Sequence, residues 1–127
     1  MEKIETRTAV ISRYRENILW QDFKPNVEID VADIKENISA CIQLVNGRKH
    51  SAVLDVRGKD VSITQKAMKY GASKEVTKYR IATAHLTSSI SDRLIGNFFI
   101  KFFRPKINNK MFSNEKQAIE WLKKIPS

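Results

Sequence analysis

The run Ser51–Val56 is the feature of this sequence that most constrains the fold. It is short, apolar and rich in β-branched residues, and Gly47 and Gly58 bound it. Such runs are typical of strands that are buried on both faces in the middle of a helix-covered sheet. In α/β domains the functional residues usually follow the carboxyl ends of such strands. We therefore expect an interior strand at Ser51–Val56 and a functional surface in the loop Arg57–Thr64.

The length and composition of the chain indicate a single domain spanning residues 1–127. The hydrophobic share of 42% is enough for a core, and no apolar run approaches the roughly 20 residues that span a bilayer. The N-terminus lacks the apolar block of a secretory signal, and the single cysteine, Cys41, excludes an internal disulfide. We therefore expect a cytoplasmic protein in which Cys41 is a small buried hydrophobic residue.

Hydrophobic periodicity divides the chain into alternating strands and helices. Two runs near the N-terminus, Ile4–Tyr14 and Ile18–Phe23, are joined by a short polar turn and predict an antiparallel hairpin. After them we expect a helix at 31–45, a strand at 51–56, a helix at 64–72, a strand at 79–86, a helix at 90–104, a strand at 110–112 and a helix at 115–122. Suitable N-cap residues are Asp30, Thr64, Ser88 or Ser89, and Asn114. The order ββαβαβαβα predicts an α/β fold with a mixed sheet of about five strands and helices packed on it.

The helix expected at residues 90–104 carries an unusually wide apolar arc. Its polar residues share one side, namely Arg93, Asn97, Lys101 and Arg104. Its apolar residues cover about half of the circumference, against the ~100° stripe of a surface helix: Ile90, Leu94, Ile95, Phe98, Phe99, Phe102 and Phe103. Two interpretations stay open. The helix docks in a groove between the sheet and the terminal segment, or Phe99 and Phe103 form an exposed patch for a second subunit, a partner or a lipid.

The formal net charge of +9 is the one unusual bulk property. It fits binding to nucleic acid, an anionic membrane or an acidic partner, and it also fits a lysine-rich solvated surface. A candidate basic patch consists of Lys66, Lys69, Lys74, Lys78 and Arg80. Binding through such a patch would weaken steeply with salt. No nucleic-acid-reading motif accompanies these residues.

No set of residues in the sequence specifies a reaction. There is no phosphate-binding glycine loop, no nucleophile elbow and no Cys–His arrangement with supporting context. His50 and His85 lack ligands at metal spacing, and we expect His85 to be a hydrogen-bonded, half-buried strand residue. Asp55 and Asp60 bracket Gly58 and are expected to be a strand-end cap and a loop charge. We therefore expect no enzymatic activity, no cofactor and no metal.

The order of elements, with Leu54–Asp55 ending the central strand and a hydroxyl residue starting the next helix, resembles the STAS superfamily of SpoIIAA-type anti-sigma-factor antagonists. The closing pattern of a Phe-rich helix, Met111–Phe112, Asn114 and Ala118–Leu122 is similar to the small uncharacterised bacterial STAS/SEC14-like proteins. The resemblance covers nearly the whole chain, with residue-level matches at Leu54–Asp55 and Ala118–Leu122. It implies a SpoIIAA-like fold.

The resemblance also implies a non-catalytic regulatory or interaction domain that docks to a protein partner or to a second copy. In antagonists of this type, the loop after the central strand carries an Asp–Ser pair whose serine is phosphorylated, and that pair falls on Ile63–Thr64 here. Thr64 is therefore a candidate phosphosite, while a hydroxyl at this place is also the commonest N-cap. The expected partner-binding residues are Lys59, Ser62, Thr64, Lys66 and Lys69. A pocket for a small ligand or lipid is a further alternative, although so short a chain has little material to enclose a whole lipid.

Overall fold

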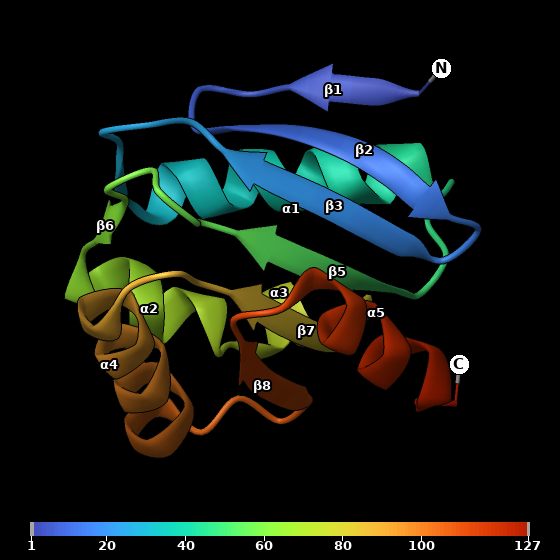
Figure 1. The fold of residues 1–127 in the computed structure, drawn as a ribbon. Coiled ribbons are helices and arrows are strands. Elements are labelled where there is room, and N and C mark those ends of the chain that lie inside the picture. The colour runs from blue at the N-terminus through green and yellow to red at the C-terminus, as the bar shows by residue number, and fades with distance from the viewer. Residues whose placement is uncertain (1, 127) are drawn as a thin grey trace.

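The computed structural model describes residues 2–126 and contains a six-stranded mixed sheet (Figure 1). Its strands are β1 (Lys3–Glu5), β2 (Ala9–Arg15), β3 (Ile18–Phe23), β5 (His50–Asp55), β7 (Arg80–Leu86) and β8 (Asn108–Phe112), and this is also their order across the sheet. β1, β2 and β3 pair in antiparallel fashion, whereas β3, β5, β7 and β8 are parallel. The predicted α/β fold with a mixed sheet is confirmed, with one strand more than expected.

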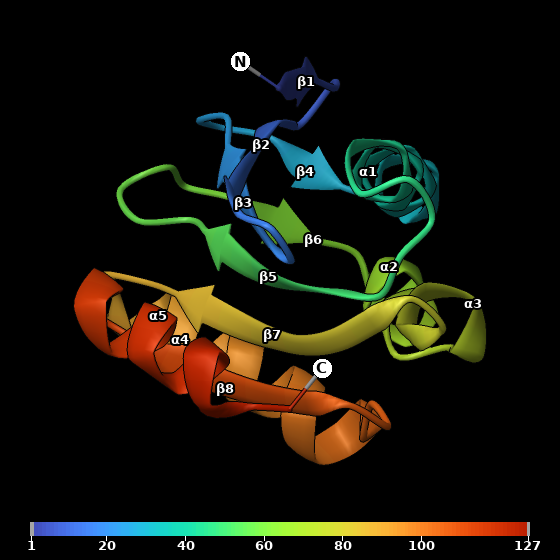
Figure 2. The ribbon, with the colours of Figure 1, turned by 90° about the vertical axis from the view of Figure 1, so that its right-hand side faces the viewer.

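Helices cover both faces of the sheet (Figure 2). One face carries α1 (Val31–Leu44), α2 (Gln65–Gly71) and α3 (Lys74–Thr77). α4 (Ile90–Phe98), which continues into the π-helical turn η1 (Phe99–Phe103), lies over the same face. The opposite face is covered by α5 (Glu115–Lys124), whose Ala118, Ile119 and Leu122 pack against β5, β7 and β8. The sheet therefore separates two hydrophobic cores.

The prediction of an interior strand at Ser51–Val56 is confirmed, because β5 lies between β3 and β7. Its side chains serve both cores: Val53 is buried in the core under α5, and Leu54 packs against the core under α1. Cys41 of α1 is fully buried in that second core, as expected. β5 and β7 both point toward the side of the molecule where α2 and α4 lie (Figure 1).

The run Ile4–Tyr14 forms two strands, so the expectation of a single strand is wrong. The chain reverses between β1 and β2, where the Thr6 N–H donates to the Ala9 carbonyl over 2.8 Å. Asn37 of α1 holds this reversal, since its amide group bonds Thr6 Oγ1 at 2.6 Å and Thr8 Oγ1 at 3.0 Å. Both threonines are buried. The turn has no Gly or Pro, the usual sequence signals of a reversal.

A second, two-stranded sheet joins the starts of α1 and α2. It pairs β4 (Glu28–Ile29) with β6 (Ser62–Ile63) in parallel, and each strand is too short to leave a periodic pattern. The Thr64 N–H donates to the Ile29 carbonyl over 3.0 Å, which extends this pairing to the first residue of the α2 cap. The small sheet thus fixes the loop after β5 to the segment before α1.

The predicted helix N-caps are confirmed. Asp30 forms a capping box with Asp33 at the start of α1, and Thr64 accepts from the Ala67 N–H at the start of α2. Ser89 caps α4 and Asn114 caps α5 in the same way. Each cap satisfies a backbone donor that the first turn of a helix leaves free.

Candidate functional site

The loop after β5 is held in place by ion pairs. Asp55, at the end of the strand, accepts from the guanidinium of Arg57 at 2.9 and 3.0 Å and from the Arg57 N–H at 3.1 Å. Burial works to raise the pKa of Asp55, but the hydrogen bonds from Arg57 outweigh it and the pKa is lowered. Arg57 also reaches Glu115 of α5 at 3.2 Å. Asp55 is therefore the strand-end cap that was expected, and the loop presents a defined surface.

The predicted partner-binding residues lie in three consecutive elements. Lys59 is in the loop, Ser62 is exposed in β6, and Lys66 and Lys69 are exposed on α2. Lys59 Nζ lies 3.9 Å from Asp22 Oδ1, so its charge is only loosely paired. These positions are accessible, and their role in partner binding stays a prediction.

Thr64 is a helix cap with two hydrogen bonds. Its Oγ1 accepts from the Ala67 N–H over 3.1 Å and donates to Asp30 Oδ1 over 3.0 Å. The side chain is half-buried rather than fully covered. A phosphate on this hydroxyl would have to break the contact with Asp30, because two anions would otherwise face each other.

The candidate basic patch is corrected at one position. Lys66, Lys69, Lys74 and Lys78 are exposed, but Arg80 is only 6% exposed and lies inside the domain. Arg80 Nη1 donates to Thr83 Oγ1 over 3.0 Å, and Nε contacts His50 Nε2 at 3.4 Å. A register shift of β5 against β7 between His50 and Ala52 accompanies this arrangement. Arg80 therefore belongs to no surface patch.

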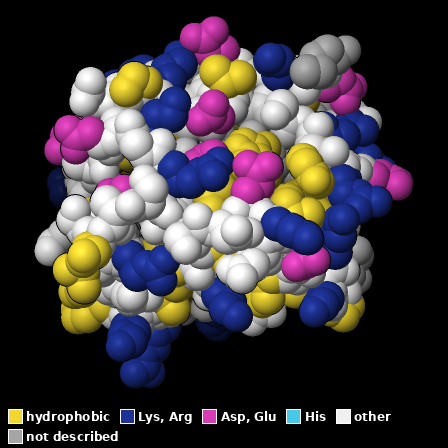
Figure 3. All heavy atoms as spheres, in the orientation of Figure 1, with side chains coloured by type: hydrophobic (Ala, Val, Ile, Leu, Met, Phe, Trp, Pro, Cys, Tyr) yellow, Lys and Arg dark blue, Asp and Glu magenta, His cyan; other side chains and the backbone are white. Residues whose placement is uncertain are grey.

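The outer surface of α4 and η1 carries an apolar ridge, defined here as Ile90, Leu94, Phe98 and Phe102. These side chains follow one another at four-residue spacing and are exposed by 80%, 64%, 42% and 67%. Phe98 and Phe102 stack with ring centroids 5.0 Å apart. No side chain of α4 or η1 is fully buried. The space-filling view shows hydrophobic atoms over α4, with Lys and Arg side chains close by (Figure 3).

The expected patch of Phe99 and Phe103 is corrected by one residue. Both of these rings are half-buried. Phe99 turns toward the sheet, where its ring lies 6.1 Å from the ring of His85, and Phe103 packs on the edges of Phe98 and Phe102. The exposed aromatic pair is therefore Phe98 and Phe102, while Phe99 and Phe103 support it from beneath.

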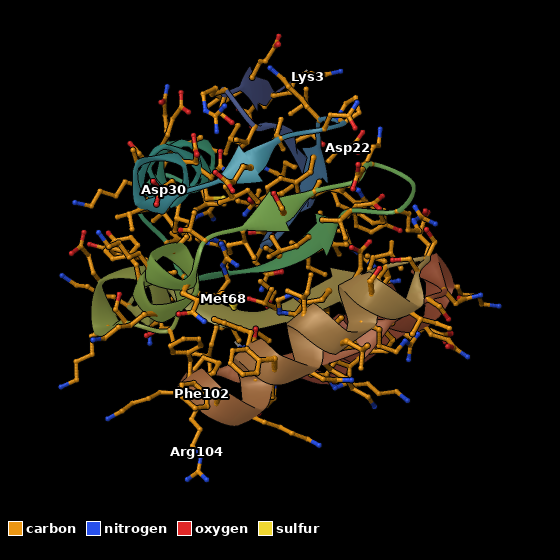
Figure 4. All side chains as sticks on the ribbon, turned by 90° about the vertical axis from the view of Figure 1, so that its left-hand side faces the viewer. Lys3, Asp22, Asp30, Met68, Phe102 and Arg104 are labelled. Carbon is orange, nitrogen blue, oxygen red and sulfur yellow. The ribbon has the colours of Figure 1, made fainter. Side chains whose placement is uncertain are left out.

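A basic strip runs beside the ridge, defined here as Arg93, Lys101 and Arg104. All three residues are exposed, and none forms an ion pair with any carboxylate within residues 2–126. Arg104 adopts a left-handed backbone conformation with φ of 47°, and its side chain points away from the body of the domain (Figure 4). The ridge and the strip together form an amphipathic outer face in which hydrophobic and cationic groups lie side by side.

The histidines have structural contacts. His85 Nε2 lies 2.7 Å from Asn109 Oδ1 and the residue is half-buried, as predicted. Burial, followed by the charge of Arg80, lowers the pKa of His50 to about 4. Within the described part of the chain, no three His, Cys, Asp or Glu side chains are grouped so that they could hold a metal ion. None of the helices there is long and apolar enough to cross a membrane.

A comparison with known protein families identifies the family to which the chain belongs. The family described as a domain of unknown function, DUF7793, matches residues 12–126. The chain belongs to the DUF7793 family. The match runs from β2 through α5, so this DUF7793 domain includes the loop after β5, the apolar ridge and the basic strip. A search of curated proteins found no match.

Among solved structures, the DUF7793 domain is similar to an uncharacterised protein of the DUF3478 family with a SpoIIAA-like fold from Shewanella loihica PV-4. The two chains share 15% identity with a TM-score of 0.61, and the match covers 88% of this chain and 90% of the other. This similarity confirms the predicted SpoIIAA-like fold.

The sequence signalled the ridge without resolving which half of the helix faces outward. The apolar arc of residues 90–104 was wide enough to bury one half and expose the other. The side of α4 that faces the sheet includes Gly96, whose missing side chain lets the helix approach Met111 of β8. That contact is tertiary and leaves no periodic trace.

Proposed function

We propose that this protein is a non-catalytic docking domain that binds an anionic membrane surface through the apolar ridge and the basic strip. The observation that carries the proposal is the exposure of four large hydrophobic side chains in a row on α4 and η1. Within residues 2–126, Tyr14 is the one exposed large hydrophobic residue outside this helix and its π-helical turn. Such concentration on one element is typical of an interaction surface.

The ridge has the form of an interfacial helix. Helices of this kind lie in the plane of a membrane, with Phe and Leu inserted among the lipid headgroups and Lys or Arg on the flanking face. Ile90, Leu94 and Phe98 supply the first element, and the basic strip supplies the second. A convex helix that projects from the domain can insert into a deformable headgroup layer without a matching concave surface.

The charge of the protein favours an anionic occupant of this surface. The chain carries a formal net charge of +9, and the unpaired cations of the basic strip lie beside the ridge. A second copy would bring the same cations against each other in a two-fold interface. An anionic lipid surface instead attracts each of them by about 1 kcal/mol.

Vesicle co-sedimentation tests the proposal directly. We expect binding to phosphatidylcholine vesicles that contain phosphatidylglycerol, weaker binding without the anionic lipid, and weakening with salt. Leu94→Ser and Phe102→Ser should each reduce the vesicle affinity by about tenfold, since each removes a large apolar side chain from the contact. Tyr14→Ser is the matched control and should leave binding unchanged, because Tyr14 is exposed on β2, away from the ridge.

A second pair of variants tests the charge. Arg93→Gln with Lys101→Gln should weaken vesicle binding, whereas Lys123→Gln with Lys124→Gln on α5 removes the same charge elsewhere. Equal effects of the two pairs would show that only net charge matters and would contradict a defined surface. Failure of the wild-type protein to bind anionic vesicles would overturn the proposal. It would also be overturned if Leu94→Ser and Phe102→Ser kept their vesicle binding and lost only the binding of a protein partner.

Docking of a protein partner through the loop Arg57–Thr64 is the second candidate function. It is supported by the exposure of Lys66 and Lys69 on α2, neither of which forms an ion pair within the described residues. Both are thus free to meet acidic groups on a partner. Variants of Thr64 separate this candidate from membrane docking, because Thr64 lies outside the apolar ridge.

A further inference from the structure

An apolar cavity of about 190 Å³ lies between the sheet and the helices that cover it. Its floor includes Leu54 of β5, His85 of β7 and Met111 of β8, and its walls include Met68 of α2 and Phe99 of η1. Figure 4 shows Met68 on the side of α2 that faces the end of α4. An apolar cavity of about 150 Å³ can hold a benzene ring. This cavity can therefore accommodate one ring with a small substituent, or an alkyl chain of similar bulk.

One wall of the cavity contains a buried cation without an anionic partner. Arg80 lines the cavity, is 6% exposed and forms no ion pair with a carboxylate among residues 2–126. Its Nε and Nη1 contact His50 and Thr83, and the guanidinium also interacts with the Cys41 thiol, so none of these partners is a carboxylate. Burying a charge without a counter-ion is costly, and buried charges in native proteins are therefore usually paired.

The groups around Arg80 do not neutralise it. Burial raises the pKa of the Cys41 thiol, which therefore stays protonated at neutral pH. Burial and the charge of Arg80 lower the pKa of His50 to about 4, so the imidazole is neutral as well. An arginine stays protonated under these conditions. A fixed positive charge thus lines a mainly apolar space, which Asp92 of α4 also lines.

The cavity also contains a buried hydroxyl without a hydrogen-bond partner among residues 2–126. Thr87 follows β7, lines the cavity and is 3% exposed, and its Oγ1 makes no hydrogen bond within the described residues. An unsatisfied buried hydroxyl costs roughly as much as a lost hydrogen bond. Thr83 and His85 lie between Arg80 and Thr87 along the same side of the strand, so hydrogen-bonding groups line the floor beneath the apolar walls.

We propose that this cavity binds a small hydrophobic carboxylate, with the carboxylate on the guanidinium of Arg80 and the apolar body against Met68, Phe99 and Met111. A carboxylate matches the planar donors of an arginine and supplies the missing counter-ion. The apolar body fills a space that no side chain occupies. This inference goes beyond membrane docking and does not depend on it, because Arg80 lies inside the domain.

Binding of two carboxylate probes, each compared with its neutral analogue, tests the inference. Octanoate against 1-octanol presents a chain, and benzoate against benzyl alcohol presents a ring. Calorimetric titration of the full chain should give an affinity at least about tenfold higher for one of the acids than for its alcohol, as expected for a charge-assisted hydrogen bond. The acid with the larger advantage identifies the apolar body. Equal affinities within both pairs would overturn the inference.

The variant Arg80→Met separates a binding role from a structural one. If Arg80 holds the ligand, this variant loses the preference for the acid and keeps the affinity for the alcohol, and the unliganded protein unfolds at the same or a higher temperature. An acid preference that persists in Arg80→Met would overturn the inference. Arg48→Met, which removes an exposed arginine that does not line the cavity, is the matched control and should keep the preference.

A measurement on the wild-type protein covers the case in which Arg80→Met does not fold. The Nε–H resonance of Arg80 in a ¹⁵N–¹H spectrum should shift on titration with the favoured acid and stay in place with the matching alcohol. An Nε–H resonance that does not move at saturating acid would show that the carboxylate binds elsewhere, and the inference would then be wrong.

Discussion

The Thr64 hydroxyl donates a hydrogen bond to Asp30 Oδ1 over 3.0 Å, so the N-cap residues of α1 and α2 are joined directly. The same Asp30 oxygen accepts from the Val31 N–H at 2.8 Å. The parallel pairing of β4 with β6 lies next to this link. Two helices far apart in the sequence are thus fixed to each other at their first residues.

Replacing Thr64 by Glu is expected to lower the free energy of unfolding by about 1–2 kcal/mol. The variant loses the α2 cap, which is typically worth about 1 kcal/mol, and places a carboxylate beside Asp30. Urea denaturation measures the change. Thr64→Ser keeps both hydrogen bonds and should stay within about 0.5 kcal/mol of the wild type. An unchanged urea midpoint for Thr64→Glu would show that the link is not stabilising.

The same position tests the phosphosite prediction. A protein captured by the wild type should be retained by Thr64→Ala, which mimics neither phosphate nor cap, and lost by Thr64→Glu. Because both variants weaken the α2 cap, a difference between them reports the added charge rather than the lost hydrogen bond. Partners that bind the two variants equally would remove the switch. Vesicle binding through the ridge should be the same in both.

Arg7 and Asp33 form an ion pair whose contribution should depend on pH. Two contacts of 2.7 Å join them, and Asp33 is buried. The hydrogen bonds from Arg7, opposed by burial, lower the pKa of Asp33 below its ordinary 3.8. A lowered carboxyl pKa stabilises the fold above pH 3.8, and this stabilisation is lost as the pH falls through the lower folded-state pKa.

Arg7→Met is therefore expected to lower the free energy of unfolding at pH 7 and to have almost no effect once Asp33 is protonated. The decrease should be modest because solvent screens the charge of the largely exposed arginine. Urea denaturation at both pH values measures it. Lys59→Gln, which removes the loose 3.9 Å contact with Asp22, is the control and should have a smaller effect. A cost for Arg7→Met that does not change with pH would contradict the ion-pair assignment.

Acid should also destabilise the domain through His50. Its pKa falls from 6.5 to about 4 on folding, so the unfolded chain takes up a proton first. The neutral imidazole stabilises the fold above pH 6.5, and this stabilisation is lost progressively as the pH falls toward 4, by roughly 3 kcal/mol in total.

The variant His50→Gln tests this dependence because it keeps a hydrogen-bonding side chain and removes the titration. It should be less stable than the wild type at pH 7 and should show a flatter fall in the free energy of unfolding between pH 6.5 and about 4. The pKa of His85 is lowered mainly by burial, so this residue adds a slope of the same sign to both proteins. Parallel pH profiles would contradict the assignment to His50.

Gly96 sets the distance between α4 and β8. A Cβ at this position would overlap Met111 Cε and Sδ, so Gly96→Ala must displace that side chain. We expect Gly96→Ala to lower stability by about 1 kcal/mol although Ala favours helix, because the overlap outweighs the propensity gain. Gly71→Ala is the control. Its Cβ would meet Phe99 and Ile34 at ordinary contact distances of 3.6–3.9 Å, so it should be neutral or slightly stabilising.

A double-mutant cycle with Met111→Ala checks this explanation. If the overlap with Met111 is the cause, Gly96→Ala should cost less in the Met111→Ala background than in the wild type. Additive effects would place the strain elsewhere in α4.

Local sequence patterns predicted most of the architecture. The apolar run at Val53–Leu54 identified the central strand, and hydroxyl or carboxyl residues before apolar periods, such as Asp30 and Asn114, identified helix starts. These signals are local, since a strand's burial and a helix's cap are both written in neighbouring residues. The reversal between β1 and β2 was not predicted, because the side chain that stabilises it belongs to Asn37, which is distant in sequence.

The candidate site was less accessible to sequence reasoning. Arg80 begins a strand, where an arginine is usually exposed, and its burial is accompanied by a register shift between β5 and β7 that local patterns do not encode. The sequence could not show that Phe98 and Phe102, rather than Phe99 and Phe103, face outward. With aromatic residues at adjacent positions, the helical period does not indicate which of them lies on the exposed side. Thr87 gave no signal at all, because a missing hydrogen-bond partner is a property of the assembled fold.

Because no side chain of α4 or η1 is fully buried, this segment belongs to neither hydrophobic core. The backbone amide hydrogens of this segment should therefore exchange with solvent through local opening. Their exchange should be much faster than that of the β5 amides, which are exposed only when the whole domain unfolds. The segment that carries the apolar ridge is therefore expected to open on its own, without unfolding of the sheet beneath it.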